Sequence, residues 1–276
     1  MKTVTLPSGR KIPALGLGTW KMGEDSRRFS REVEALQRGI DLGMTLIDTA
    51  EMYGDGGAER VVGEAIRGRR QDVFLVSKVS PQNASHSGAI AACDRSLQRL
   101  QVDFIDLYLL HWRGPILLSE TLDAFGELQG AGKISSFGVS NFDTKDMEEA
   151  WSIPRGHEIA TNQILYNLTR RSVEHELLPW CREHRVPVMA YSPVEQGRLI
   201  GNSKLKKIAA ARDASPSQVA LAWLLAQPEI IVIPKSSDPK HVEENRGAAE
   251  IALTANELSA LDAAFPRPKN KALEML

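Results

Sequence analysis

The sequence predicts an α/β fold, a single (β/α)8 barrel of the TIM type. Short apolar runs end near Gly18, Asp48, Lys78, His111, Ser140, Gln163, Tyr191 and Pro234. Most of the intervals between these ends are close to the roughly 30 residues that one strand and its crossover helix require. The chain has 276 residues, near the roughly 250 residues of a one-domain barrel. We find no linker and expect one domain over residues 1–276.

The strands and helices differ in their apolar patterns. Residues 73–76, 105–110 and 230–233 are almost continuously apolar, as expected for parallel strands buried on both faces. Between the runs the apolar residues follow a helical period. For example, Val33, Leu36 and Ile40 share one face of the predicted first helix.

The two ends of the chain add elements to the barrel. Residues 5–12 carry Pro-Ser-Gly between two short apolar runs, which predicts an N-terminal β-hairpin. The long interval before the last strand predicts an extra helix over residues 203–211, and residues 256–264 predict a final helix. These are the extra C-terminal helices. From Pro266 onward the chain is expected to be irregular.

Composition excludes several classes of protein. The chain has 34 basic and 35 acidic residues, so we expect neither a nucleic-acid partner nor an anionic membrane. Cys93 and Cys181 are the two cysteines and are expected to be free thiols in a reducing cytoplasm. No apolar run is long enough for a signal peptide or a membrane span. His175, Cys181 and His184 are potential metal ligands close together in the sequence. Only Cys181 and His184 have the spacing that places two ligands on one face of a helix, so we expect no metal site.

The candidate chemistry lies at the carboxyl ends of the strands, where barrel enzymes build their active sites. Asp48, Lys78 and His111 end three neighbouring runs and should fall within roughly 10 Å of one another. Tyr53 follows on a glycine-rich loop. A lysine ammonium lowers the pKa of a nearby phenol, Asp48 would orient Lys78, and His111 would donate a hydrogen bond or relay a proton. Such a site protonates a carbonyl oxygen while a hydride attacks the carbon.

Each of these residues also has a structural interpretation. A histidine after a strand is often structural, a lysine at a strand end is often a solvated charge, and an aspartate there often caps a helix. A Schiff-base aldolase is another alternative, since a lysine amine attacks carbonyls. Asp48 argues against it, because a paired carboxylate keeps Lys78 protonated.

Eight ordered motifs give the chain a family resemblance: GLGTW at 16–20, DTAEMY at 48–53, VSK at 76–78, DLYLLH at 106–111, GVSNF at 138–142, NQ at 162–163, YSP at 191–193 and IPKS at 233–236. In this order they resemble the aldo-keto reductases, and the resemblance extends from Gly16 to Asn245. Within that family the chain is most similar to bacterial methylglyoxal-reducing members, over residues 48–57 and 109–112.

The resemblance implies a role for each matching residue. Tyr53 would be the general acid, supported by Asp48, Lys78 and His111. Residues that would hold NADP(H) are Ser140, Asn141 and Gln163 at the carboxamide, Tyr191 against the nicotinamide ring, Ser192, Pro193 and Val194 along the pyrophosphate, and Lys235, Ser236, Glu244 and Asn245 at the adenosine end. Trp20 and Trp112 would line the substrate pocket, the alternative being ordinary core packing. The Rossmann fingerprint is absent, because Lys21 stands where the third glycine would be.

These observations predict an NADPH-dependent reductase of small aldehydes and 2-oxoaldehydes such as methylglyoxal, acting as a monomer. The loop after the fourth strand is short, and the tail beyond Phe265 is rich in proline and lysine, which predicts an open pocket suited to small substrates. His241 stands where the family often has an arginine, which weakens the expected selection for NADPH. The alternatives are a broad aldehyde and ketone reductase without a 2-oxo preference, and a nicotinamide-nucleotide-binding regulatory subunit with little turnover.

Overall fold

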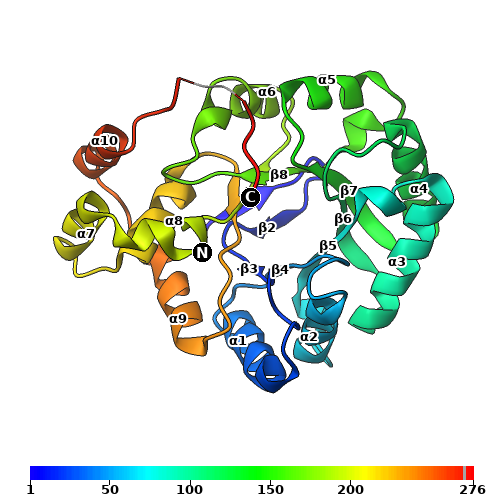
Figure 1. Ribbon diagram of the computed structural model, residues 1–276, viewed down its shortest axis with the longest axis horizontal. Coiled ribbons are helices and arrows are strands. Elements are labelled where there is room, and N and C mark those ends of the chain that lie inside the picture. The colour runs from blue at the N-terminus through cyan, green and yellow to red at the C-terminus, as the bar shows by residue number, and fades with distance from the viewer. Residues whose placement is uncertain (270–271) are drawn as a thin grey trace.

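The chain forms a parallel sheet of eight strands surrounded by helices (Figure 1). The structure, a computed structural model, describes residues 1–269 and 272–276. Along the sheet, neighbouring strands follow chain order: β3 (Leu17–Gly18), β4 (Leu46–Asp48), β5 (Phe74–Val79), β6 (Ile105–Leu110), β7 (Ile134–Ser140), β8 (Asn162–Leu165), β9 (Val188–Tyr191) and β10 (Ile230–Val232). This order is consistent with the predicted (β/α)8 fold.

The two edges of the sheet meet. Parallel bridges pair Leu15 with Val232 and Gly18 with Lys235. The amide nitrogen of Gly16 donates to the carbonyl of Val232 at 2.8 Å. The segment around β3 is therefore hydrogen-bonded to the segment around β10, and the carboxyl ends of all the strands face the same end of the molecule.

A two-stranded hairpin precedes this sheet, as predicted. Strands β1 (Thr3–Thr5) and β2 (Lys11–Pro13) are antiparallel. Gly9 supports the turn with a φ of +83°, a conformation that glycine adopts without steric cost. Apolar side chains of the hairpin join one buried cluster with inward-facing side chains of the strands, namely Val4, Leu6, Ile12, Leu46, Phe74, Leu107, Met189 and Ile231. Leu46 and Phe74 begin their strands, so the hairpin covers the amino end of the sheet and leaves the carboxyl end for a site.

The helices are α1 (Phe29–Asp41), α2 (Gly57–Ala65), α3 (His86–Leu100), α4 (Leu118–Gly130), α5 (Thr144–Ser152), α6 (Leu177–Glu183), α7 (Ser203–Ala210), α8 (Pro216–Ala226), α9 (Pro239–Gly247) and α10 (Ala255–Ala264). Most of them surround the outer face of the sheet, whereas α7 packs on α8 and α10 packs on α7. In α1, Val33, Leu36 and Ile40 are buried, as their spacing predicts. None of the helices in the described part of the chain is long and apolar enough to cross a membrane.

The strand ends differ slightly from the expected ones. β8 continues past Gln163 to Leu165, and β10 ends at Val232, before Pro234. The first difference follows from Ile164 and Leu165, which are buried and continue the apolar run. The second follows from Pro234, which has no amide hydrogen to donate to a neighbouring strand.

Candidate active site

Strand alternation brings Asp48, Lys78 and His111 onto the inner face of the sheet. Phe74 and Val76 of β5 belong to the inner cluster while Leu75 faces the helices, so the period of two places Lys78 on the inner face as well. Leu46 in β4 and Leu109 in β6 set the same register for Asp48 and for His111, the residue after β6. Three polar groups thus continue rows of apolar side chains at the carboxyl end.

The four predicted catalytic residues, Asp48, Tyr53, Lys78 and His111, lie together and form a tetrad. The Lys78 Nζ donates to Asp48 Oδ2 at 2.9 Å and to the Tyr53 hydroxyl at 3.2 Å. The rings of Tyr53 and His111 meet edge to face, with centroids 5.5 Å apart. These contacts fall well inside the roughly 10 Å that strand spacing predicts.

Glycines fold the Tyr53 loop back over the strand ends. Gly54 has a φ of +57°, and a Cβ there would lie 2.7 Å from the carbonyl oxygen of Met22. A Cβ on Gly57 would lie 2.3 Å from the carbonyl oxygen of Gly23. The loop therefore packs against residues 22–23 at a distance that only glycine permits.

Lys78 is a fully buried cation with partners that keep it charged. Its side chain is 0% exposed, and Nζ also donates to the Thr49 carbonyl at 2.8 Å. Burial by itself lowers the pKa of this ammonium, but the charge of Asp48 and the nearby Tyr53 outweigh burial and raise it. A lysine held protonated in this way is a poor amine nucleophile, which argues against the aldolase alternative.

The pKa of Tyr53 moves in the direction opposite to the one expected. Burial of the phenol raises its pKa, and the Lys78 ammonium offsets only part of that increase. The expectation of a lowered pKa considered the cation alone and was wrong in the net direction. The Tyr53 hydroxyl therefore keeps its proton at neutral pH.

His111 is neutral in this environment. Burial and the Lys78 charge lower its pKa to about 2. Its Nδ1 atom is buried and has no hydrogen-bond partner among the described residues. Its ring packs on Trp112, with 4.9 Å between the ring centroids. A neutral imidazole donates or accepts a hydrogen bond without adding charge to the site.

A cavity of about 780 Å³ opens above these residues, within the size range of ligand pockets. Apart from Lys78, which lies beneath it, every predicted site residue lines the cavity: Trp20, Asp48, Tyr53, His111, Trp112, Ser140, Asn141, Gln163, Tyr191, Ser192, Pro193, Val194, Lys235, Ser236, Glu244 and Asn245. Trp20 is 40% exposed, which is incompatible with the core-packing alternative for that residue.

Polar side chains near the tetrad form a connected network. Gln163 Nε2 donates to Asp48 Oδ1 at 2.7 Å. Asn141 Nδ2 donates to the His111 carbonyl at 3.1 Å, and Asn141 Oδ1 accepts from the Tyr191 hydroxyl at 2.9 Å. Asn141 has a φ of 59°, a left-handed conformation that asparagine tolerates better than most residues. The two amides are thereby fixed against the wall of the cavity.

Lys235 brings a cation to the cavity wall, which Ser236, His241 and Asn245 also line. Burial lowers the pKa of Lys235. The carboxylates of Glu32 and Glu24 oppose that effect, and the charges of Arg28 and Lys21 add to it. An anionic ligand beside this partly buried ammonium would favour its charged form.

Part of the cavity wall was not predicted from the sequence. Met275 and Leu276 at the chain end and Ile200 in the loop after β9 also line it. The expectation of an open mouth is therefore corrected, because the last residues of the tail cover part of it. The sequence does show that Met275 and Leu276 are apolar and follow a stretch rich in proline and lysine. That pattern does not indicate which part of the fold the two residues contact.

The residues considered for a metal have other contacts. Cys181 is buried, His175 Nε2 lies 2.7 Å from the Pro268 carbonyl, and His184 stacks on Trp180. Over residues 1–269 and 272–276, no three His, Cys, Asp or Glu side chains are grouped so that they could hold a metal ion.

Comparisons with known proteins agree with this geometry. The model of the aldo/keto reductase family matches residues 14–265. Methylglyoxal reductase YeaE of Escherichia coli is 50% identical, with 100% of this chain and 99% of the relative aligned. Glyoxal reductase of Bacillus subtilis is 33% identical over 95% of this chain and 92% of the relative.

A solved structure is also very similar. The aldo-keto reductase of Klebsiella pneumoniae in complex with NADPH has a TM-score of 0.97 and 49% identity, covering 100% of this chain and 99% of that one. With a family match over nearly the whole chain, the chain belongs to the aldo/keto reductase family.

Proposed function

We propose that this protein uses NADPH to reduce small aldehydes and 2-oxoaldehydes to alcohols, with Tyr53 as the proton donor. The observation that carries the proposal is the Tyr53 hydroxyl, which lines the cavity and lies 3.2 Å from a buried, charged Lys78. The similarity to a methylglyoxal reductase and to an NADPH-bound structure supports the choice of substrate and cofactor.

The cavity residues fit a nicotinamide nucleotide. The cavity wall carries two kinds of polar group, the side-chain amides of Asn141 and Gln163 and the ammonium of Lys235. Amide groups suit a carboxamide, and cations suit phosphate. Asn141, Gln163 and Ser140 would hold the nicotinamide, Tyr191 would stack on its ring, and Ser192, Pro193 and Val194 would follow the pyrophosphate. Lys235, Ser236, Glu244 and Asn245 would contact the adenosine end.

The chain's own residues supply the proton chemistry. When bound, the cofactor supplies a hydride to the carbonyl carbon. Tyr53 donates its hydroxyl proton to the oxygen that gains charge, and the Lys78 ammonium stabilises the phenolate left behind. Asp48 keeps Lys78 charged and in place. Neutral His111 donates a hydrogen bond to the same oxygen, and Trp20 and Trp112 form an apolar wall around the substrate.

Several finer features belong to the same proposal. The chain would act as a single domain and as a monomer in the cytoplasm, without nucleic-acid or membrane partners. Helices α7 and α10 would be additions to the barrel rather than members of its repeating units. A regulatory subunit is the less favoured function, because Asp48, Tyr53 and His111 line the cavity and Lys78 lies 3.2 Å from the Tyr53 hydroxyl.

A substrate panel tests the reaction and the pocket together. We expect kcat/KM to be highest for methylglyoxal, lower for a simple aliphatic aldehyde and lowest for a steroid ketone. The adjacent carbonyl of methylglyoxal withdraws electrons and favours hydride attack, whereas the tail residues Met275 and Leu276 leave less room for a steroid. Equal values for the two aldehydes would favour the broad-specificity alternative, and a steroid ketone in first place would refute the proposed pocket.

The residue at position 241 should set the strength of cofactor choice. The additional phosphate of NADPH requires cations, and Lys235 and His241 both line the cavity. An arginine would present a planar guanidinium that binds phosphate through two hydrogen bonds, which an imidazole cannot do. We therefore expect the ratio of Kd for NADH to Kd for NADPH to exceed one in the wild type and to be larger in the His241→Arg variant. A wild-type ratio of one or below, or an equal ratio in the variant, would contradict this role.

A further inference from the structure

The last residues of the chain lie at the carboxyl end of the barrel. In the view of Figure 1 they lie over the middle of the sheet. Leu273 packs against the outer core, and Met275 and Leu276 line the cavity. The backbone of Leu276 hydrogen-bonds the Tyr191 hydroxyl, whose pKa is raised to about 12 mainly by burial. The end of the tail thus touches a residue that we assign to the cofactor.

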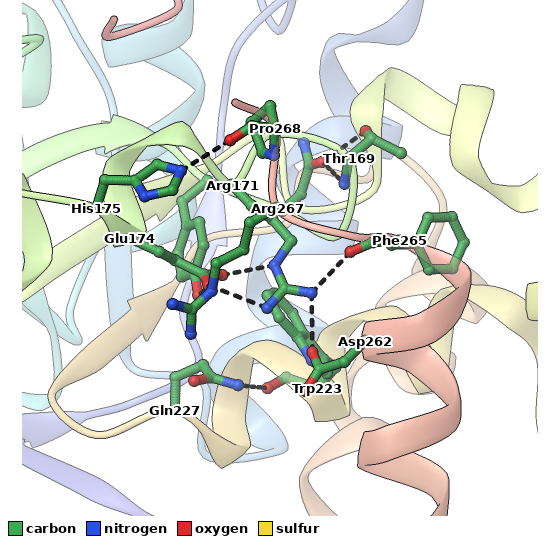
Figure 2. Close-up of polar contacts among 12 residues, drawn as sticks. Thr169, Arg171, Glu174, His175, Trp223, Gln227, Asp262, Phe265, Arg267 and Pro268 are labelled. Atoms are coloured by element: carbon green, nitrogen blue, oxygen red, sulfur yellow. Dashed lines mark hydrogen bonds and ion pairs between the residues drawn. The ribbon is translucent and has the colours of Figure 1, made fainter. Parts of the chain in front are cut away.

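The start of the tail is fixed by a buried arginine (Figure 2). Arg171 Nη1 donates to Asp262 Oδ1 and to the Phe265 carbonyl, both at 2.8 Å, and Arg171 Nε donates to Glu174 Oε1 at 2.7 Å. Arg267 pairs with the same Glu174 carboxylate at 2.5 Å. These contacts attach residues 262–268 firmly to the segment before α6.

The residue before Arg171, Arg170, joins the end of the tail to a second part of the cavity wall. Its Nη1 lies 2.6 Å from Glu274 Oε1, and its Nη2 lies 2.7 Å from Glu195 Oε1. Glu195 begins the loop segment η6 (Glu195–Gly201), and Gln196, Gly197 and Ile200 of that segment line the cavity. The Arg170 guanidinium therefore pairs both with the tail, through Glu274, and with the η6 segment, through Glu195.

The η6 segment needs support of this kind. Glu195, Gln196 and Gly197 have φ values of 53°, 55° and 88°, a left-handed conformation that non-glycine residues rarely adopt. Such a backbone persists where its surroundings hold it. The Glu195 carboxylate is nearly buried and accepts hydrogen bonds from Asn167, Arg170 and Arg198.

We propose that the Arg170–Glu274 ion pair is a latch that ties the tail to the η6 segment and slows release of the cofactor. The inference rests on the proposed function, because the ligand it retains is NADPH. Arg170 and Glu274 are positioning residues, which act through the segments that cover the cavity. With the pair broken, the tail and the η6 segment open independently, and the cofactor leaves more often.

The test replaces only the charge. Glu274→Gln keeps the size of the side chain and an oxygen that accepts from Arg170. A preformed complex with NADPH is mixed with excess NADP⁺, and the loss of nicotinamide fluorescence gives the dissociation rate. We expect this rate to rise about two- to five-fold at low salt, as for a partly exposed ion pair, and to converge with the wild-type rate at about 1 M salt, where screening weakens the latch.

Two further variants distinguish a latch from a general loss of charge. Glu250→Gln removes the Arg246–Glu250 pair of 2.6 Å, outside the cavity lining, and should leave the rate unchanged. Arg170→Gln should raise the rate, and adding Glu274→Gln to it should change little more, because the pair is already broken.

The outcomes separate the latch from the proposed function. A wild-type protein that does not bind NADPH would overturn both. Normal binding, with the same dissociation rate in wild type and Glu274→Gln at low salt, would overturn the latch alone. An equal rise of the NADPH dissociation rate in Glu250→Gln would also overturn the latch.

Discussion

Turnover of the Tyr53→Phe variant is expected to fall by about 10²–10⁴-fold, the usual contribution of general acid catalysis. The substitution removes one hydroxyl, and that hydroxyl is the group that Lys78 contacts at 3.2 Å. The phenyl ring preserves the wall of the cavity, so the affinity for NADPH should stay close to that of the wild type. Steady-state turnover with methylglyoxal and fluorescence titration with NADPH measure the two quantities separately.

Tyr108→Phe provides a matched control for this variant. Tyr108 is fully buried and packs on Phe125 behind β6, outside the lining of the cavity. Loss of its hydroxyl should leave turnover nearly unchanged. If Tyr53→Phe kept more than about a tenth of wild-type turnover, the loss would be smaller than general acid catalysis usually contributes. That result would exclude Tyr53 as the proton donor.

The Asp48→Asn variant is expected to lose about 3–5 kcal/mol of unfolding free energy, the cost of leaving a buried charge without its partner. Lys78 is 0% exposed and its Nζ lies 2.9 Å from Asp48 Oδ2, so water cannot replace the carboxylate. The asparagine still accepts the hydrogen bond from Gln163, so the loss arises from the charge. Urea unfolding of the two proteins measures the difference.

A double variant separates stability from catalysis. Adding Lys78→Met to Asp48→Asn removes the unpaired cation and should restore much of the unfolding free energy, while turnover stays low because the phenolate of Tyr53 has no cation beside it. An Asp48→Asn protein as stable as the wild type would show that Lys78 is not held charged by Asp48.

Strand ends explain why the tetrad could be predicted. Asp48, Lys78 and His111 end three apolar runs, and the carboxyl ends of parallel strands lie at one end of a barrel. The hairpin at residues 3–13 was equally visible through its Pro-Ser-Gly turn. Local patterns of this kind specify which end of the sheet a residue occupies before the tertiary structure is known.

The remaining features depend on contacts between distant parts of the chain. The tail reaches the cavity because Arg171 pairs with Asp262 and Arg170 pairs with Glu274, and no local pattern connects residues so far apart in the sequence. The direction of the Tyr53 pKa shift likewise depends on burial, which outweighs the Lys78 charge. The proximity of Lys78 was predictable, whereas the degree of burial was not.

Multiple-turnover oxidation of NADPH tests the central claim most directly. A small amount of the protein is mixed with NADPH and methylglyoxal in large excess, and the loss of nicotinamide absorbance is followed while the alcohol product is identified. We predict that each protein molecule oxidises many equivalents of NADPH and forms one alcohol for each. Oxidation that stops at one equivalent per protein molecule, or oxidation without alcohol formation, would contradict the assignment as a carbonyl reductase.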